Sequence, residues 1–178
     1  GIGKSRLISE FIKTSNHGIV GNNIIRVASD SVSISPYQTF ISIIKKSLLI
    51  ERSDSKEATL KKFNVGFNEL TEVVDGELKH QLVKFKPRIA YLLGLRISDQ
   101  PSQVSGVDLR DEIQLSIRIF IQAICKQSNF SNVPFIIIFD DLQWIDSASM
   151  DVLNKIIDME SIGISKSDQR NQALYFIF

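Results

Sequence analysis

The run FIIIFDD at residues 135–141 constrains the fold of this chain more than any other stretch. Its five apolar residues end in two acids, Asp140 and Asp141, and such a run is typical of a strand buried on both faces of a parallel sheet. NIIRVAS at 23–29 and ALYFIF at 173–178 also predict strands. Because helical patterns separate these runs, the sequence predicts an α/β fold with a mostly parallel central sheet and helices in layers on it.

Four segments carry apolar residues at helical spacing, namely 4–14, 35–50, 108–127 and 147–159. In the second of these, Pro36 stands where a first-turn proline belongs, and the apolar stripe is Phe40, Ile43, Ile44 and Leu48. The pattern between 52 and 107 is weaker and predicts a helical insert. We expect short helices there at about 56–64, 66–74 and 75–93, followed by a loop at 98–107.

Composition excludes several classes of function. The chain has 178 residues with 21 basic and 20 acidic side chains, so nothing in its charge favours nucleic acid or an anionic membrane as a partner. The longest apolar run, PFIIIF, is far shorter than the roughly 18 residues that a membrane-spanning helix needs. Cys125 is the single cysteine, which fits a reducing compartment, and we therefore expect a cytoplasmic location.

The first five residues, GIGKS, supply the end of a phosphate-binding loop. The full pattern is G-x-x-x-x-G-K-[ST] at the start of a helix, and Gly3, Lys4 and Ser5 match its last three fixed positions. In such a loop, backbone N–H groups converge on phosphate oxygens, the lysine reaches the β- and γ-phosphates, and the hydroxyl binds Mg²⁺. A chance match is the alternative for so short a motif.

The two acids provide the second half of the predicted site. Ligands of open α/β sheets bind at the carboxyl ends of the strands, where Asp140 and Asp141 lie. We expect Asp140 to hold Mg²⁺ through water, as a Walker B acid does, and Asp141 to orient or deprotonate the attacking water. A solvated turn is the alternative for two adjacent acids. The predicted ligands are ATP and Mg²⁺. The predicted nucleotide contacts are Gly1, Ile2, Gly3, Lys4, Ser5 and Arg6, the metal ligands are Ser5 and Asp140, and the catalytic residues are Lys4 and Asp141.

GIGKSRL, followed at a distance by IIIFDDLQWIDSASMDVL, resembles the ATPase module of the STAND branch of the AAA+ superfamily. Such modules occur inside large signalling proteins, among them multisensor kinases, nucleotide cyclases and transcriptional regulators. The resemblance implies a P-loop NTPase fold. Many vigorous AAA+ ATPases have glutamate at the position of Asp141, so an aspartate there implies slow hydrolysis. The resemblance also implies partners in neighbouring domains of the parent chain and a nucleotide-dependent oligomer.

The ends of the sequence suggest a fragment. It begins at a motif glycine and ends in an apolar run, so we expect a single partial domain over 1–178, with the first strand and the C-terminal lid missing. A loop without the strand that anchors it loses its preorganisation, and we expect the isolated chain to bind ATP poorly and to be inactive. The leading hypothesis is a regulatory ATP switch with slow hydrolysis. The alternatives are a P-loop phosphotransferase for a small acceptor and a scaffold that never hydrolyses ATP.

Two residues near the acids have interpretations of their own. Trp144 is expected to be a packing anchor rather than a platform for adenine. Asp146 is expected to cap the helix that follows rather than to serve as a third acid of the site.

Overall fold

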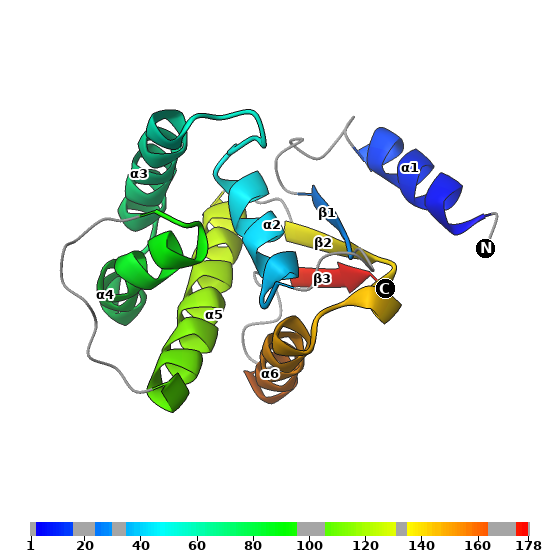
Figure 1. The fold of residues 1–178 in the computed structure, drawn as a ribbon. Helices are drawn as coiled ribbons and strands as arrows, with labels where there is room; N and C mark the ends of the chain where they lie inside the picture. Colours follow the sequence, from blue (N-terminus) through cyan, green and yellow to red (C-terminus); the bar gives the residue numbers. More distant parts are fainter. Residues whose placement is uncertain are drawn as a thin grey trace.

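The computed structural model describes residues 3–15, 24–29, 35–95, 106–130, 135–163 and 174–177. Within them, helices and strands alternate around a small parallel sheet, as predicted (Figure 1). The elements are α1 (Lys4–Ser15), β1 (Ile24–Ala28), α2 (Gln38–Ser47), α3 (Lys56–Val73), α4 (Gly76–Leu92), α5 (Gly106–Phe130), β2 (Phe135–Asp140), the short 3₁₀ helix η1 (Leu142–Trp144), α6 (Ser147–Gly163) and β3 (Leu174–Ile177). The strand order is β1-β2-β3, so the predicted buried strand lies in the middle.

The middle strand β2 is buried on both faces, because it has a parallel neighbour on each side and its first five residues have buried side chains. Phe135, Ile137 and Phe139 belong to the main hydrophobic core. Helix α2 packs against β1, helix α5 packs against β2, and α2, α5 and α6 contact one another. The main core therefore lies between these three helices and the sheet.

The opposite face of the sheet is less apolar near its carboxyl end. In β1, Ile25 and Val27 lie in the core, while Arg26 between them belongs to the other face. The parallel register places Arg26 opposite Ile138 and Ala28 opposite Asp140. Arg26 and Asp140 therefore share one face of the sheet, on neighbouring strands.

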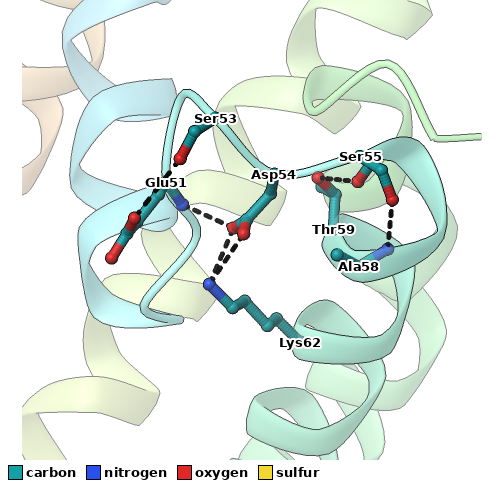
Figure 2. A network of polar contacts seen from close by, with 7 residues as sticks. All are labelled: Glu51, Ser53, Asp54, Ser55, Ala58, Thr59 and Lys62. Carbon is teal, nitrogen blue, oxygen red and sulfur yellow. Dashed lines mark hydrogen bonds and ion pairs between the residues drawn. The ribbon is translucent and has the colours of Figure 1, made fainter.

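The predicted helical insert is a pair of helices, α3 and α4, that pack against each other and against α5 (Figure 1). The Ser55 hydroxyl caps α3 by accepting a hydrogen bond from the N–H of Ala58 at 3.2 Å. Just before this cap, the Asp54 carboxylate accepts hydrogen bonds from the N–H of Glu51 at 2.7 Å and from Lys62 Nζ at 2.8 Å (Figure 2). These contacts fix the loop that leads from α2 into the insert.

Two details of the predicted helices are wrong. The residues expected to form separate helices at 56–64 and 66–74 form one helix, α3, which runs through Gly66. At Gly66 helix α3 approaches Leu48 closely: a Cβ added to this glycine would lie 2.7 Å from Leu48 Cδ2. Pro36 does not lie in the first turn of α2 but precedes Tyr37, which occupies the N-cap position of this helix.

The loop predicted at 98–107 lies mostly outside the described residues, and α5 already begins at Gly106. The apolar face predicted for this helix is confirmed, since Ile113, Ile117, Phe120, Ile121 and Ile124 are buried. None of the described helices combines the length and the apolar content that crossing a membrane requires.

Candidate nucleotide site

The two predicted acids follow one another at the carboxyl end of the middle strand. Asp140 is the last residue of β2, and Asp141 is the first residue after it. The backbone of Asp141 is left-handed, with φ 57°, which ends the extended conformation at once. This change of direction follows from the sequence only in part, because aspartate tolerates a left-handed conformation better than most residues but does not require it.

The Asp140 carboxylate forms an ion pair with the guanidinium of Arg26 on β1, through Oδ2 and Nη2. The side chains are 20% and 34% exposed, respectively, so the pair lies at the edge of the protein and is not fully desolvated. Among the described residues, Arg26 is the one partner of this carboxylate. Sequence reasoning missed Arg26, although a lone charged residue inside the apolar strand IIRVA is a signal that could have found it.

Lys46 contacts the backbone of Arg26. Its Nζ donates a hydrogen bond to the backbone oxygen of Arg26. Burial lowers the pKa of Lys46 below its ordinary value, and the nearby charges of Arg26 and Arg52 lower it further. Arg26 and Arg52 therefore both lie within electrostatic reach of Lys46.

Asp141 is exposed, and its Oδ1 accepts a hydrogen bond from Gln143 Nε2 at 3.1 Å. The backbone oxygen of Asp141 accepts a hydrogen bond from the N–H of Trp144 at 2.9 Å, which closes the turn of η1. Trp144 itself is 54% exposed. The expectation that Trp144 anchors the core is therefore wrong, because the 3₁₀ turn after Asp141 leaves more than half of this side chain open to solvent.

Asp146 caps helix α6, as predicted. Its Oδ1 accepts a hydrogen bond from the N–H of Ser149 at 2.8 Å, and its Oδ2 accepts one from the Ser149 hydroxyl at 2.7 Å. The same Oδ1 also accepts a hydrogen bond from the N–H of Tyr37 at 2.9 Å, a contact that sequence reasoning missed. Asp146 therefore joins the beginnings of α2 and α6.

The predicted phosphate loop is described only in part. Gly1 and Ile2 lie outside the described residues, as do the side chains of Lys4 and Ser5, whose backbone begins α1. Gly3 forms the turn before this helix, and its oxygen accepts a hydrogen bond from the N–H of Leu7 at 3.0 Å. The Arg6 side chain is exposed. The helix that the motif predicts directly after the loop is confirmed.

Helix α1 lies apart from the other helices, on the side of the sheet towards which the β3 arrow points (Figure 1). Leu7 on its apolar face is 73% exposed. Among the described residues, no hydrogen bond or ion pair joins Asp140 or Asp141 to α1. Within the part of the chain that the structure describes, no such contact therefore joins the two halves of the predicted site.

Hollows among the described residues include a cleft near the helices and a small cavity near the sheet. A cleft of about 410 Å³ lies between α5 and α6, and Arg110 and Asp151 form an ion pair beside it. None of the predicted site residues lines this cleft. A smaller cavity of about 90 Å³ lies beside the ends of β1 and β2, lined in part by Ser29, Arg52 and Trp144. Its volume corresponds to about three water molecules, so it does not accommodate a nucleotide.

The donors present are suited to Mg²⁺ that arrives with a nucleotide. Within the described part of the chain, no group of three or more His, Cys, Asp or Glu side chains could enclose a metal ion. Mg²⁺ bound with ATP needs only one or two protein ligands, because phosphates and waters fill the other positions. The partly exposed carboxylate of Asp140, a hard oxygen donor at the end of a rigid strand, fits that requirement.

Comparison with known proteins gives one match. A family model described as an AAA ATPase domain matches residues 1–165. The matched range covers the predicted loop, the insert and both acids. No curated protein and no solved structure matches the chain.

Proposed function

Since the chain belongs to the AAA ATPase domain family, we propose that it binds ATP with Mg²⁺ and hydrolyses ATP slowly, as a regulatory switch within a larger signalling protein of the STAND type. Membership of this family implies a P-loop NTPase fold and nucleotide binding with ATP hydrolysis. The observation that carries the proposal is the position of Asp140 and Asp141 directly at the carboxyl end of the buried middle strand. The proposed unit is one domain over residues 1–178, with its helical insert at about 52–107.

In this proposal the backbone N–H groups of the glycine loop and of the first turn of α1 bind phosphate oxygens. The helix supports this role, because its first N–H groups have no partner within the helix and its dipole favours negative charge there. Lys4 contacts the β- and γ-phosphates, and Ser5 and Asp140 hold the metal. When bound, Mg²⁺ neutralises part of the charge that develops on the phosphate oxygens. The remaining proposed contacts are Gly1, Ile2, Gly3 and Arg6.

Asp141 is proposed to accept a proton from the attacking water or to orient it. Its exposed carboxylate has one described hydrogen-bond partner, Gln143, so Oδ2 keeps its capacity to accept from water. Hydrolysis then changes how this domain packs against neighbouring domains of the parent chain or against further copies in an oligomer. Phosphoryl transfer to a small acceptor is a separate reaction, and a product assay with water as the acceptor distinguishes it.

Two substitutions in the full natural protein test the proposal. Lys4→Ala removes a phosphate contact and Asp140→Ala removes a metal ligand, so each should weaken ATP binding in Mg²⁺ by at least about tenfold. Isothermal titration calorimetry measures the affinity. Lys13→Ala on the same helix and Asp111→Ala on α5 are matched controls that change the same charges elsewhere, and they should leave the affinity unchanged. Equal affinity in all four variants would contradict the proposal.

A further inference from the structure

The contact between Arg26 and Asp140 involves the carboxylate that the proposed function assigns to Mg²⁺. The two residues come from neighbouring parallel strands and share one face of the sheet, since Arg26 pairs with Ile138, two positions before Asp140. The guanidinium binds Oδ2 and leaves Oδ1 without a described partner. A hydrogen bond in which both partners are charged is stronger than a neutral one, so the guanidinium binds this carboxylate more strongly than a neutral donor would.

Separating Arg26 from Asp140 costs free energy. Its only described side-chain partner is this carboxylate, and its backbone oxygen accepts a hydrogen bond from Lys46. Arg52 also lies close enough to Lys46 to lower the pKa of that amine. The described positive charge in contact with Asp140 is therefore that of Arg26, and a cation that approaches the carboxylate meets repulsion from this guanidinium.

We propose that Arg26 is a positioning residue that competes with the divalent cation for Asp140 and thereby sets the Mg²⁺ concentration at which ATP binds. This inference rests on the proposed function, because it takes Asp140 as the metal ligand. A cation near Asp140 must either share the carboxylate with the guanidinium or displace it. Both states are less favourable than binding to a carboxylate without a partner, so Arg26 weakens the metal site.

If Arg26 only oriented Asp140, its removal would have the opposite effect on Mg²⁺ binding. The loss of Arg26 would then leave Asp140 misplaced and the metal more weakly bound. The fold favours competition. Asp140 ends the middle strand, and register pairs connect that strand to both neighbours, so its backbone is fixed without Arg26. Its side chain is short and only 20% exposed, which leaves few conformations for an ion pair to select.

The test is the Mg²⁺ dependence of nucleotide binding in the full natural protein, measured with a fluorescent ATP analogue at constant ionic strength. Arg26→Gln removes the charge, and the Mg²⁺ concentration for half-maximal binding should fall by about threefold or more. Arg26→Lys keeps the charge and should stay within about twofold of the wild type. Arg26→Met serves as a second neutral variant if Arg26→Gln fails to fold. Arg110→Gln, which breaks the ion pair with Asp151 on other elements, is the matched control and should change nothing.

A double-mutant cycle separates a direct effect from a general one. In an Asp140→Asn background, Arg26→Gln should no longer shift the Mg²⁺ requirement, because the partner through which it acts is gone. An unchanged or increased Mg²⁺ requirement in both neutral variants overturns the role of Arg26 while the proposed function stands. Absence of Mg²⁺-dependent ATP binding in the wild type overturns both.

Discussion

The backbone N–H of Tyr37 donates a hydrogen bond to Oδ1 of Asp146, which lies 109 positions away in the sequence and 2.9 Å away in space. Tyr37 has a left-handed backbone, with φ 62°, that a bulky residue rarely adopts. The contact connects the residue before α2 to the residue that caps α6. Since Asp146 follows the two acids by only a few positions, this hydrogen bond also holds the turn after β2 against α2.

Replacing Asp146 by alanine should lower the free energy of unfolding by about 1–3 kcal/mol. The substitution removes the cap of α6 and leaves the N–H groups of Tyr37 and Ser149 without their partner. Asp146→Asn keeps one carbonyl oxygen and should cost less. Urea unfolding measures both values. Asp111→Ala, at an exposed position on α5, is the control and should change stability by less than about 0.5 kcal/mol.

The Asp54 carboxylate should make stability sensitive to acid. Hydrogen bonds from Lys62 and from the N–H of Glu51 lower its pKa below the ordinary value of 3.8 (Figure 2). A carboxylate with a lowered folded-state pKa stabilises the fold above its unfolded-state pKa, and this contribution is lost as the pH falls through the folded-state pKa. Asp54→Asn should therefore destabilise the protein near pH 6 and have a smaller effect near about pH 2.

The partner of Asp54 offers an independent check on this explanation. Lys62→Gln removes the largest cause of the lowered pKa, so it should reduce the acid dependence of stability in the same direction as Asp54→Asn. The measurement is the urea midpoint as a function of pH. If both variants lose stability between these pH values as steeply as the wild type, then Asp54 does not make the predicted contribution.

The close approach of α3 to Leu48 predicts a difference between two substitutions at Gly66. Alanine gains about 1 kcal/mol in helix propensity and meets only the end of a flexible side chain, Leu48 Cδ2, so its net effect should be within about 1 kcal/mol. Valine adds two further carbons against the buried Leu48 and should cost about 1–3 kcal/mol. Thermal and urea unfolding of both variants give the comparison. Equal stability of the two variants would show that α3 and Leu48 separate without cost.

How far the sequence could predict this structure depends on the kind of signal. The strand at 135–140 was predictable because a short uninterrupted apolar run that ends in two acids is typical of a strand buried on both faces, and α5 was predictable because its apolar face repeats over many turns. The break predicted between 64 and 66 was wrong, because the pattern between 52 and 107 is too weak to show where one helix ends and the next begins. The close contact of Gly66 with Leu48, which belongs to another element, is not visible in that local pattern.

The candidate site was likewise predictable only in part. The acids at the end of β2 could be predicted from local pattern, because the carboxyl end of a parallel strand is where ligands bind. The partners of those acids could not, since Arg26 reaches Asp140 only through the register of two strands more than a hundred residues apart. Tyr37 reaches Asp146 in the same way, through packing of α2 beside α6. Long-range pairing determines these contacts, and a single sequence does not record it.

The proposed division of labour between the two acids gives the sharpest functional prediction. If Asp140 holds the metal and Asp141 acts on water, then Asp141→Asn should lower kcat for ATP hydrolysis by about 100-fold or more and leave ATP affinity within about threefold. The amide keeps the size of the side chain and the capacity of Oδ1 to accept from Gln143, so the turn of η1 should be retained. Steady-state hydrolysis assays and equilibrium binding on the full natural protein measure the two quantities.

Gln143→Ala, which removes the hydrogen-bond neighbour of Asp141 and leaves the carboxylate, is the control and should keep most of the activity. A variant that loses binding and hydrolysis together would assign Asp141 to nucleotide binding instead, because a residue that acts only in the chemical step changes kcat without changing the affinity for substrate.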